Sequence, residues 1–351
     1  MKNNIKLSII MPFFNRAKLV EYTINSILSN GFKDWELLAI DDGSDKDSVA
    51  YLKNQISDSR ITFIKRNRLP KGAQTCRNIG LSMAKGEYVV FFDSDDYVAP
   101  YCFAQRIKTL EANPEQDFMV FPSGTFINNR FIKTVSDNVY GYPIMKDDIG
   151  AFASMQLPFV VCNNIYRTEK LRNNHISWDE SLLSLQDSDF NLQAILSGMN
   201  YKYAENAEPD YGYRIEERGQ SISKKITSDL HKRSHLYRLE KNISTIQALY
   251  SHQYDTKLHQ GILSIYNSVM SNGIDLAFSA QLLNIEKKYG IKQHIIFSIQ
   301  IWLTKMISII ISAKRARQIV MLPFLIMEIV HRKQKARRIS NLKRNILLPR
   351  H

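Results

Sequence analysis

The sequence contains few cysteines, and their spacing matches no ligand or disulfide motif. Its 351 residues include three cysteines, Cys76, Cys102 and Cys162, and no CxxC pair. This pattern argues against a zinc site or a disulfide framework and fits a reducing compartment. The strand-like segment behind the N-terminal Met spans only about seven residues, too short for the apolar core of a secretion signal. We therefore expect a cytoplasmic protein.

Glycine-rich phosphate loops are also missing. Gly43, Gly72, Gly80 and Gly86 do not have the spacing of a GxGxxG fingerprint or of a P-loop. This weakens the case for a dinucleotide-dependent redox enzyme or an ATPase. The chain contains neither HExxH nor GxSxG, so a zinc protease and a serine hydrolase of those types lack support as well.

Positive charge is concentrated at the C-terminus. The chain has 47 Lys and Arg against 34 Asp and Glu, a net charge of +13. Residues 313–351 hold eleven of the basic residues and a single acidic one, Glu328, so the rest of the chain is close to neutral. A partner that recognises positive charge should bind at this end.

Strand and helix patterns alternate over the first 120 residues. Apolar, β-prone runs lie at 6–11, 35–40, 61–64, 88–92 and 118–121, and helical spacing lies at 17–30, 45–56, 73–85 and 100–112. This alternation predicts right-handed crossovers and a mostly parallel, Rossmann-like α/β sheet with flanking helices. Residues 122–215 are less regular, and residues 228–289 again have a helical pattern.

Acidic residues stand where two of the expected strands end. Asp93, Asp95 and Asp96 follow the apolar run at 88–92, and Asp41 and Asp42 follow the run at 35–40. The carboxyl ends of parallel strands form the edge at which open α/β sheets bind ligands. Acids crowded there repel one another, and Mg²⁺ or Mn²⁺ shared with substrate phosphates would satisfy them. Taken alone, the 93–96 segment is equally well read as a solvated acidic turn.

Four motifs, in order and in register, resemble family 2 glycosyltransferases of the GT-A fold. They are Ser8–Asn15, Asp41–Ser44, Arg77–Gly80 and Phe91–Asp96, and the likeness extends over residues 5–215. The resemblance implies an inverting enzyme that uses a nucleotide-diphospho-sugar, most often a UDP-sugar, with Mn²⁺ or Mg²⁺. We therefore expect a GT-A domain at 1–225 and a helical, basic C-terminal region at 226–351.

The resemblance also implies roles for individual residues. On the donor side, Pro12, Phe14 and Asn15 would border the nucleotide, and Asp41 and Asp42 would hold the uracil. Arg77 would face the donor. Asp93 would bind the ribose or sugar, and Asp95 would bind the metal together with Asp93. The family often has Tyr at the position of Phe14, which can stack on a base but offers no hydroxyl. Arg214 would clamp a phosphate or form a surface ion pair with Glu216 or Glu217.

A catalytic base is implied at the start of a helix beneath the acceptor, where this chain has Gln186 and Asp187. Inversion needs a carboxylate that takes the acceptor proton on the face opposite the leaving diphosphate. The family usually has Glu at the position of Gln186. We favour Asp187 over Asp189 as the base, because an acid at the position of Asp189 also complements the helix dipole.

Two strongly apolar runs, 294–311 and 319–329, alternate with basic residues near the C-terminus. The first is about 18 residues long and includes Gln300 and Lys305, whereas a spanning helix needs about 20 apolar residues. Binding to an anionic membrane surface fits better, with apolar faces in the headgroup boundary and Lys or Arg on the lipid charges. Helical packing or self-association is an alternative. Nucleic acid is disfavoured because no aromatics interrupt the basic run.

Together these features predict an inverting glycosyltransferase that acts on a bacterial-type cell-surface glycan or lipid-linked acceptor at the inner face of the membrane. One alternative is a non-catalytic relative that binds a glycan or a partner, which the intact acidic set disfavours. Another is a metal-dependent nucleotidyltransferase, which the missing glycine-rich loop disfavours. An oligomer is compatible with all three.

Overall fold

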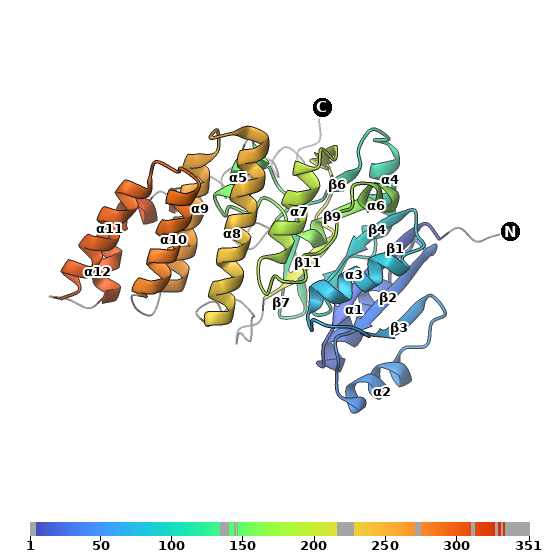
Figure 1. Ribbon diagram of the computed structural model, residues 1–351. Coiled ribbons are helices and arrows are strands. Elements are labelled where there is room, and N and C mark those ends of the chain that lie inside the picture. The colour runs from blue at the N-terminus through green and yellow to red at the C-terminus, as the bar shows by residue number, and fades with distance from the viewer. Residues whose placement is uncertain are drawn as a thin grey trace.

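The computed structural model describes residues 5–133, 140–143, 145, 147–215, 228–270, 275–309, 313–326, 329–330 and 333. An α/β unit forms one end of the molecule, and a row of C-terminal helices extends from it (Figure 1). This is the α/β fold with flanking helices and a helical C-terminal region that the sequence predicts.

The main sheet has seven strands in the order β10-β6-β9-β4-β1-β2-β3. The strands are β1 (Leu7–Phe13), β2 (Trp35–Asp41), β3 (Ile61–Lys65), β4 (Tyr88–Phe91), β6 (Phe118–Val120), β9 (Asn164–Arg167) and β10 (Tyr201–Tyr203). Strand β9 runs antiparallel to β4 and β6, and the other pairings are parallel. Every residue of β1 and β2 is buried, as expected for parallel strands covered on both faces.

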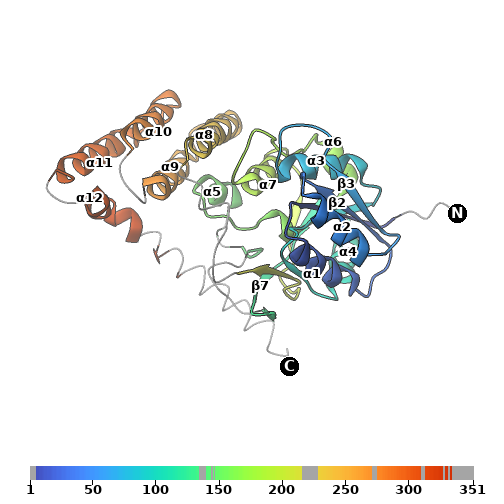
Figure 2. The ribbon, with the colours of Figure 1, turned by 90° about the horizontal axis from the view of Figure 1, so that it is seen from below.

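Helices cover both faces of this sheet (Figure 2). On one side lie α1 (Ala17–Leu28), α2 (Lys46–Gln55) and α4 (Cys102–Glu111), and on the other lie α3 (Ala73–Met83), α6 (Thr168–Asn173) and α7 (Gln186–Leu196). Successive side chains of β1 point to opposite faces of the sheet. Ile9 and Met11 pack in the hydrophobic cluster on one face, and Ile10 packs in the cluster on the other.

A second, four-stranded sheet was not apparent from the sequence. Its order is β5-β11-β7-β8, with β5 (Tyr97–Val98), β11 (Tyr211–Arg214), β7 (Ser123–Ile127) and β8 (Arg130–Ile132). Strands of two to five residues carry too little periodicity to detect. A fully buried ion pair, Arg106 Nη2 to Asp210 Oδ1 at 2.6 Å, joins α4 to the segment before β11.

The C-terminal helices are continuous with the core of the α/β unit. They are α8 (Asp229–Tyr250), α9 (Asp255–Val269), α10 (Leu276–Lys288), α11 (His294–Ile307) and α12 (Ala313–Val320), and the short α5 (Asp148–Ala153) and η1 (Val161–Asn163) precede them. One hydrophobic cluster contains Phe190 of α7, Ile243 of α8 and Ile262 of α9. The domain boundary at residue 225 stays a prediction. None of the described helices has the length and apolar character needed to cross a bilayer.

Candidate functional site

The acidic residues singled out in the sequence stand at one edge of the main sheet. Asp41 is the last residue of β2 and pairs in register with Phe13 of β1. Asp93 comes two residues after β4, whose Phe91 pairs with Ile10 of β1. The three strand ends therefore form one rim, as the parallel order predicts.

Arg77 joins the end of β4 to the start of α7. Its Nη2 donates to Asp93 Oδ1 at 2.6 Å, and its Nη1 lies 3.8 Å from Asp187 Oδ1. The guanidinium also lies over the Trp178 ring, 4.3 Å from its centroid. The Arg77 side chain is only 5% exposed, so it holds the two carboxylates from beneath rather than from solvent. The predicted contact of Arg77 with a donor stays a prediction.

The environment of Asp187 suits a proton acceptor. Burial raises the pKa of this carboxyl to about 6; the Arg77 guanidinium opposes that rise, and the charge of Asp93 adds to it. A base whose pKa lies near the working pH can both accept a proton and be largely ionised beforehand. The side chain is 28% exposed, so an acceptor hydroxyl has access to it.

Asp189, two residues further on, is engaged elsewhere. It is 1% exposed, and its Oδ2 lies 2.9 Å from Lys241 Nζ of α8. The same ammonium lies 2.7 Å from Asp179 Oδ2. Gln193 also donates to Asp189. Asp189 thus takes part in a buried ion-pair network between α7 and α8, which the helix-dipole argument alone did not foresee.

The three acids after β4 have separate environments. Asp93 and Asp95 are 38% and 43% exposed, and Asp95 Oδ2 lies 3.4 Å from Arg16 Nη1. Asp96 is buried and accepts hydrogen bonds from the Tyr211 hydroxyl and the Arg214 N–H, both at 2.7 Å. Burial and the neighbouring carboxylates raise the pKa of Asp96 well above its usual value. Asp96 therefore anchors β11, and a solvated acidic turn does not describe this segment.

Arg214 is held against the same turn. Its Nε donates to the carbonyl oxygen of Asp95, and its guanidinium lies 4.8 Å from the Tyr22 ring centroid. The alternative pairing with Glu216 or Glu217 lies outside the described residues. The position beside the exposed Asp95 is compatible with a contact to a phosphate.

Asp93 and Asp95 have the chemistry of a divalent metal site that a substrate completes. Their carboxylate oxygens are hard donors, and both are partly exposed at the rim. Within the part of the chain that the structure describes, no three His, Cys, Asp or Glu side chains cluster as metal ligands. Mg²⁺ is typically bound by one or two carboxylates, with waters and substrate phosphates filling the rest. The two acids fit that arrangement.

Asp41 and Asp42 shape the loop after β2 in different ways. Asp41 Oδ1 accepts from the N–H groups of Gly43 at 3.1 Å and Ser44 at 2.7 Å, which fixes a tight turn. Gly43 adopts φ 93°, a conformation that residues with a Cβ rarely take. Asp42 Oδ1 accepts from Arg66 Nε at 2.7 Å. The predicted contacts with uracil stay predictions for both residues.

Phe14 presents its ring to solvent just past the end of β1. It is 45% exposed, and Lys71 Nζ lies 3.4 Å from the ring centroid. An exposed ring at this rim can stack on a nucleobase, which would replace the ammonium. The sequence predicted that the strand ends before Pro12, but β1 continues through Pro12 to Phe13. The buried Pro12 is tolerated because β4 already ends at Phe91, so no ladder bond to β4 is lost.

Asn15 ties the loop after β1 to the loop after β2. Its N–H donates to Ser44 Oγ at 2.8 Å, and its Oδ1 accepts from the Asp45 N–H at 3.0 Å. Asn15 and Arg16 have φ values of 53° and 52°, both in the left-handed region. Consecutive non-glycine residues in that region are strained, and such strain concentrates at functional sites. This backbone conformation directs the Arg16 side chain toward Asp95. That contact was not predicted from the sequence.

Helix α3 also fixes the loop that precedes α7. Asn78 Oδ1 accepts from the Trp178 N–H at 2.8 Å, and its Nδ2 donates to the Trp178 carbonyl at 2.8 Å and to Glu180 Oε1 at 2.7 Å. One turn earlier, Gln74 Oε1 accepts from Gln186 Nε2 at 2.9 Å. Gln186, which replaces the family's usual Glu, therefore makes one amide bond to α3, and its Oε1 also accepts from Arg77 Nη1 of α3 at 3.4 Å.

The Asn78→Ala substitution should weaken the fold measurably, because the backbone of the buried Trp178 loses both hydrogen bonds to the Asn78 side chain. We expect the free energy of unfolding to fall by about 1–3 kcal/mol. Chemical denaturation measures this change. Asn173→Ala is the matched control, since Asn173 is exposed and its side chain makes one 3.3 Å bond to Glu169. Equal effects of the two substitutions would contradict the anchoring role of Asn78.

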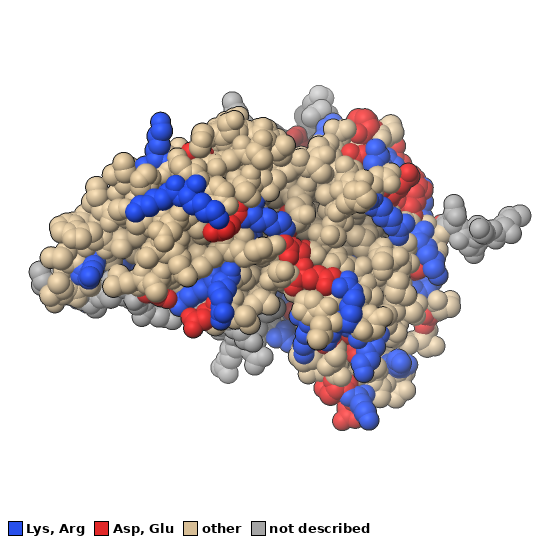
Figure 3. All heavy atoms as spheres, viewed as in Figure 1, with Lys and Arg blue, Asp and Glu red and all other residues tan. Residues whose placement is uncertain are grey.

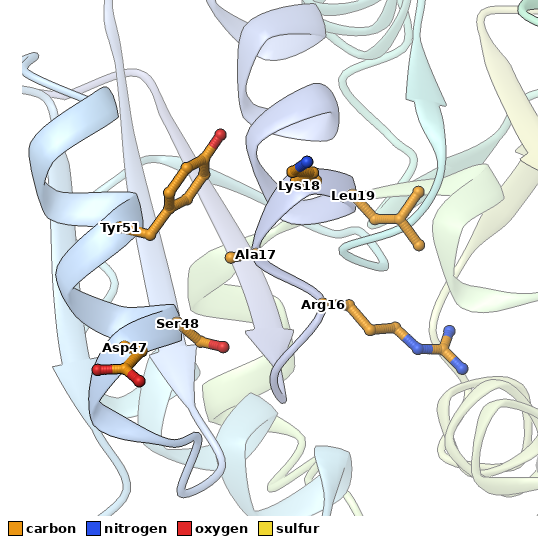
Figure 4. Close-up of a pocket in the computed structure, with 7 residues that line it drawn as sticks. All are labelled: Arg16, Ala17, Lys18, Leu19, Asp47, Ser48 and Tyr51. Carbon is orange, nitrogen blue, oxygen red and sulfur yellow. The ribbon is translucent and has the colours of Figure 1, made fainter.

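A shallow hollow of about 480 Å³ lies beside this rim, between the starts of α1 and α2 (Figure 4). Its lining consists of Arg16, Ala17, Lys18, Leu19, Asp47, Ser48 and Tyr51. In the close-up the Arg16 side chain points away from α2. The hollow contains none of the carboxylates bridged by Arg77. The candidate site is therefore defined by its converging side chains and not by this depression.

Comparison with known proteins agrees with this geometry. Residues 8–173 match the family model described as glycosyl transferase family 2. A GalNAc(5)-diNAcBac-PP-undecaprenol beta-1,3-glucosyltransferase of Campylobacter jejuni is 41% identical over 92 residues, which cover 26% of this chain and 30% of that protein. WfaP of Escherichia coli, a UDP-Glc:alpha-D-GlcNAc-diphosphoundecaprenol beta-1,3-glucosyltransferase, is 37% identical over 128 residues, 36% of this chain and 49% of WfaP. The chain thus spans less than half the length of these two relatives.

Solved structures show the same fold over nearly the whole chain. The crystal structure of S. aureus TarS 1–349 in complex with UDP-GlcNAc superposes with a TM-score of 0.61 and 18% sequence identity, covering 94% of this chain and 90% of that one. The α/β sheet and the C-terminal helices therefore form a known arrangement. Residues 8–173 thus resemble glycosyltransferase family 2, and the fold is GT-A, as the four motifs indicate.

Proposed function

We propose that this protein is an inverting glycosyltransferase that uses a nucleotide-diphospho-sugar, with a UDP-sugar as the first candidate. One observation carries the proposal: the Arg77 guanidinium contacts both Asp93, on the donor side of the rim, and Asp187, at the start of α7. A carboxylate suited to accept a proton is thereby held next to the acids that would receive the donor.

The reaction assigns each charged group a task. Asp187 takes the proton of the acceptor hydroxyl while that oxygen attacks the anomeric carbon, and the bond from that carbon to the diphosphate breaks. The electron pair leaves with the nucleoside diphosphate. Arg16, 3.4 Å from Asp95, stands where it can stabilise the departing negative charge. Phe14 would hold the base by stacking.

Asp95 and Asp93 would hold Mn²⁺ or Mg²⁺ together with the diphosphate. The cation would neutralise negative charge on the leaving group. Both carboxylates are accessible, and each already faces a cationic side chain, Arg77 or Arg16. These contacts keep the pair oriented toward the rim.

The acceptor would be a lipid-linked or cell-surface glycan, handled at the cytoplasmic face of the membrane. The names of the Campylobacter and E. coli relatives specify undecaprenol-diphosphate-linked glycans as their acceptors. The TarS structure contains UDP-GlcNAc. These likenesses support a hexosyl or N-acetylhexosaminyl donor.

A panel of nucleotide sugars tests the donor. With Mn²⁺ present, we expect one UDP-sugar to be hydrolysed slowly in the absence of an acceptor, and release of UDP measures this. Release of pyrophosphate from a nucleoside triphosphate would instead support a nucleotidyltransferase. Failure to bind or turn over any nucleotide sugar would support a non-catalytic relative.

A further inference from the structure

Helix α11 and the turn after it expose a continuous apolar stripe. Its members lie one or two helical turns apart and are 36–76% exposed: Ile295, Ile296, Ile299, Trp302, Leu303, Met306 and Ile309. Spacings of three, four and seven residues place them on one side of the helix. The opposite side packs inward through Phe297 and Thr304, which are 0% and 1% exposed. We call this set the α11 stripe.

The exposed face of α11 carries almost no polar side chain. Among the described residues from His294 to Ile309, Lys305 is the one exposed position outside the stripe. Further exposed apolar residues follow at helical spacing, namely Ile319, Leu322, Ile326, Ile329 and Val330. In Figure 3 the end of the molecule formed by α11 and α12 is mostly free of charged side chains, whereas acidic and basic side chains mix along the boundary with the α/β unit. Apolar area concentrated in this way marks an interaction surface.

The charge around the stripe has one sign. Between Glu286 and Glu328 the sequence has no acidic residue and seven basic ones: Lys287, Lys288, Lys292, Lys305, Lys314, Arg315 and Arg317. Pairing two copies through this region would bring like charges together, which is unfavourable. An anionic surface would neutralise them. The charge therefore favours an anionic partner over a second copy.

We propose that the α11 stripe is a membrane-docking surface that lies in the interface of an anionic bilayer. The helix has fourteen residues, too few to cross, and its apolar face can enter the boundary between headgroups and acyl chains while Lys305 stays at the headgroups. Trp302, 58% exposed near the middle of the stripe, is a residue type enriched at such interfaces. The docking itself does not require catalysis. Its benefit for a lipid-linked acceptor rests on the proposed function.

Trp302 supplies a native probe for the test. The other two tryptophans, Trp35 and Trp178, are each 2% exposed and should not respond to lipid. The full-length protein is mixed with vesicles of phosphatidylcholine alone or of phosphatidylcholine with phosphatidylglycerol. We expect a blue shift of the emission and co-sedimentation with the anionic vesicles, and binding about tenfold or more weaker to neutral vesicles or at high salt.

A pair of substitutions separates docking from folding. The double variant Ile299→Glu, Met306→Glu places two negative charges in the stripe. Both positions are exposed, so the fold should be kept. We expect binding to anionic vesicles to be lost. The matched control is Leu230→Glu with Leu249→Glu, two exposed residues of α8 that are 61% and 54% exposed. The control should bind vesicles as the wild type does.

Three outcomes would overturn the proposal. Equal binding to neutral and anionic vesicles would remove the role of charge. Full binding by the Ile299→Glu, Met306→Glu variant would move the contact elsewhere. A dimer in sedimentation velocity that this variant abolishes would assign the stripe to a second copy. Because vesicle binding is measured without substrate, its failure is distinguishable from failure of the glycosyltransferase proposal.

Discussion

The Asp187→Asn variant is expected to bind UDP as tightly as the wild type and to transfer sugar about 10²–10⁴-fold more slowly. The amide has the size of the carboxyl but cannot accept the acceptor proton. Arg77 keeps its 2.6 Å bond to Asp93, so the donor side should not change. Single-turnover transfer measures the loss, and calorimetric titration with UDP measures binding.

Stability provides an internal check on this variant. Burial raises the pKa of Asp187 to about 6 in the folded protein, above its unfolded value. At neutral pH the ionised carboxyl therefore disfavours the folded state, so the neutral amide should leave Tm unchanged or higher. Asp189→Asn is the comparison: burial raises the pKa of that carboxyl as well, so its amide should also leave Tm unchanged or higher, but transfer should be retained. An active Asp187→Asn variant would move the base elsewhere.

The same pKa predicts the acid limb of the pH profile. Asp187 must be ionised to accept a proton, and it becomes protonated as the pH falls through about 6. The value of kcat/KM should therefore fall tenfold per pH unit well below that pH, since one proton is involved. If kcat/KM instead stayed constant until the pH reached the usual pKa range of an exposed carboxyl, burial would not govern the pKa of the base.

The Asp95→Ala variant is expected to lose Mn²⁺-dependent turnover almost completely, because the metal would keep one protein carboxylate of two. The fold should survive, since Asp95 is 43% exposed and its backbone carbonyl, which accepts from Arg214, remains. Binding of Mn²⁺ in the presence of UDP, followed by electron paramagnetic resonance, gives a readout independent of activity. We expect a loss of affinity of about tenfold or more.

Asp34→Ala is the control for this experiment. Asp34 is exposed and immediately precedes β2, at the opposite end of the sheet from the rim. Removing its charge tests whether a general loss of negative potential affects metal binding. Undiminished Mn²⁺ binding by Asp95→Ala would refute the metal assignment, and an equal loss in Asp34→Ala would make the effect non-specific.

The sequence predicted five of the seven strands of the main sheet, because these five are apolar runs bounded by acids, Gly and Pro, but it missed the short strands β9 and β10. The helices from Ala17 to Glu111 lie within a few residues of their predicted ranges. The small sheet was missed, since β7 and β11 pair across almost ninety residues of chain and neither has a repeating pattern. Long-range pairing of short strands leaves no local trace in a sequence.

The acidic residues of the candidate site could be predicted from the sequence better than its cationic residues. Order along the chain indicated that Asp41 and Asp93 would approach one rim, because parallel strands end together, and the family resemblance added Asp187. It gave no sign that Asp96 is buried beneath Tyr211, since the three neighbouring acids look alike in sequence. Arg16 and Lys71 lie in loops, and their directions depend on backbone conformations such as the left-handed φ of Arg16.

The ammonium of Lys241 has a consequence for how this protein can be divided. From helix α8 it reaches Asp179, in the loop before the proposed catalytic helix, and Asp189, within that helix. A fragment ending at residue 225 would leave two carboxylates without their counterion and strip one wall from the core that contains Phe190. The C-terminal helices therefore serve as a brace for the α/β unit, and a shortened protein should be unstable even with every predicted site residue intact.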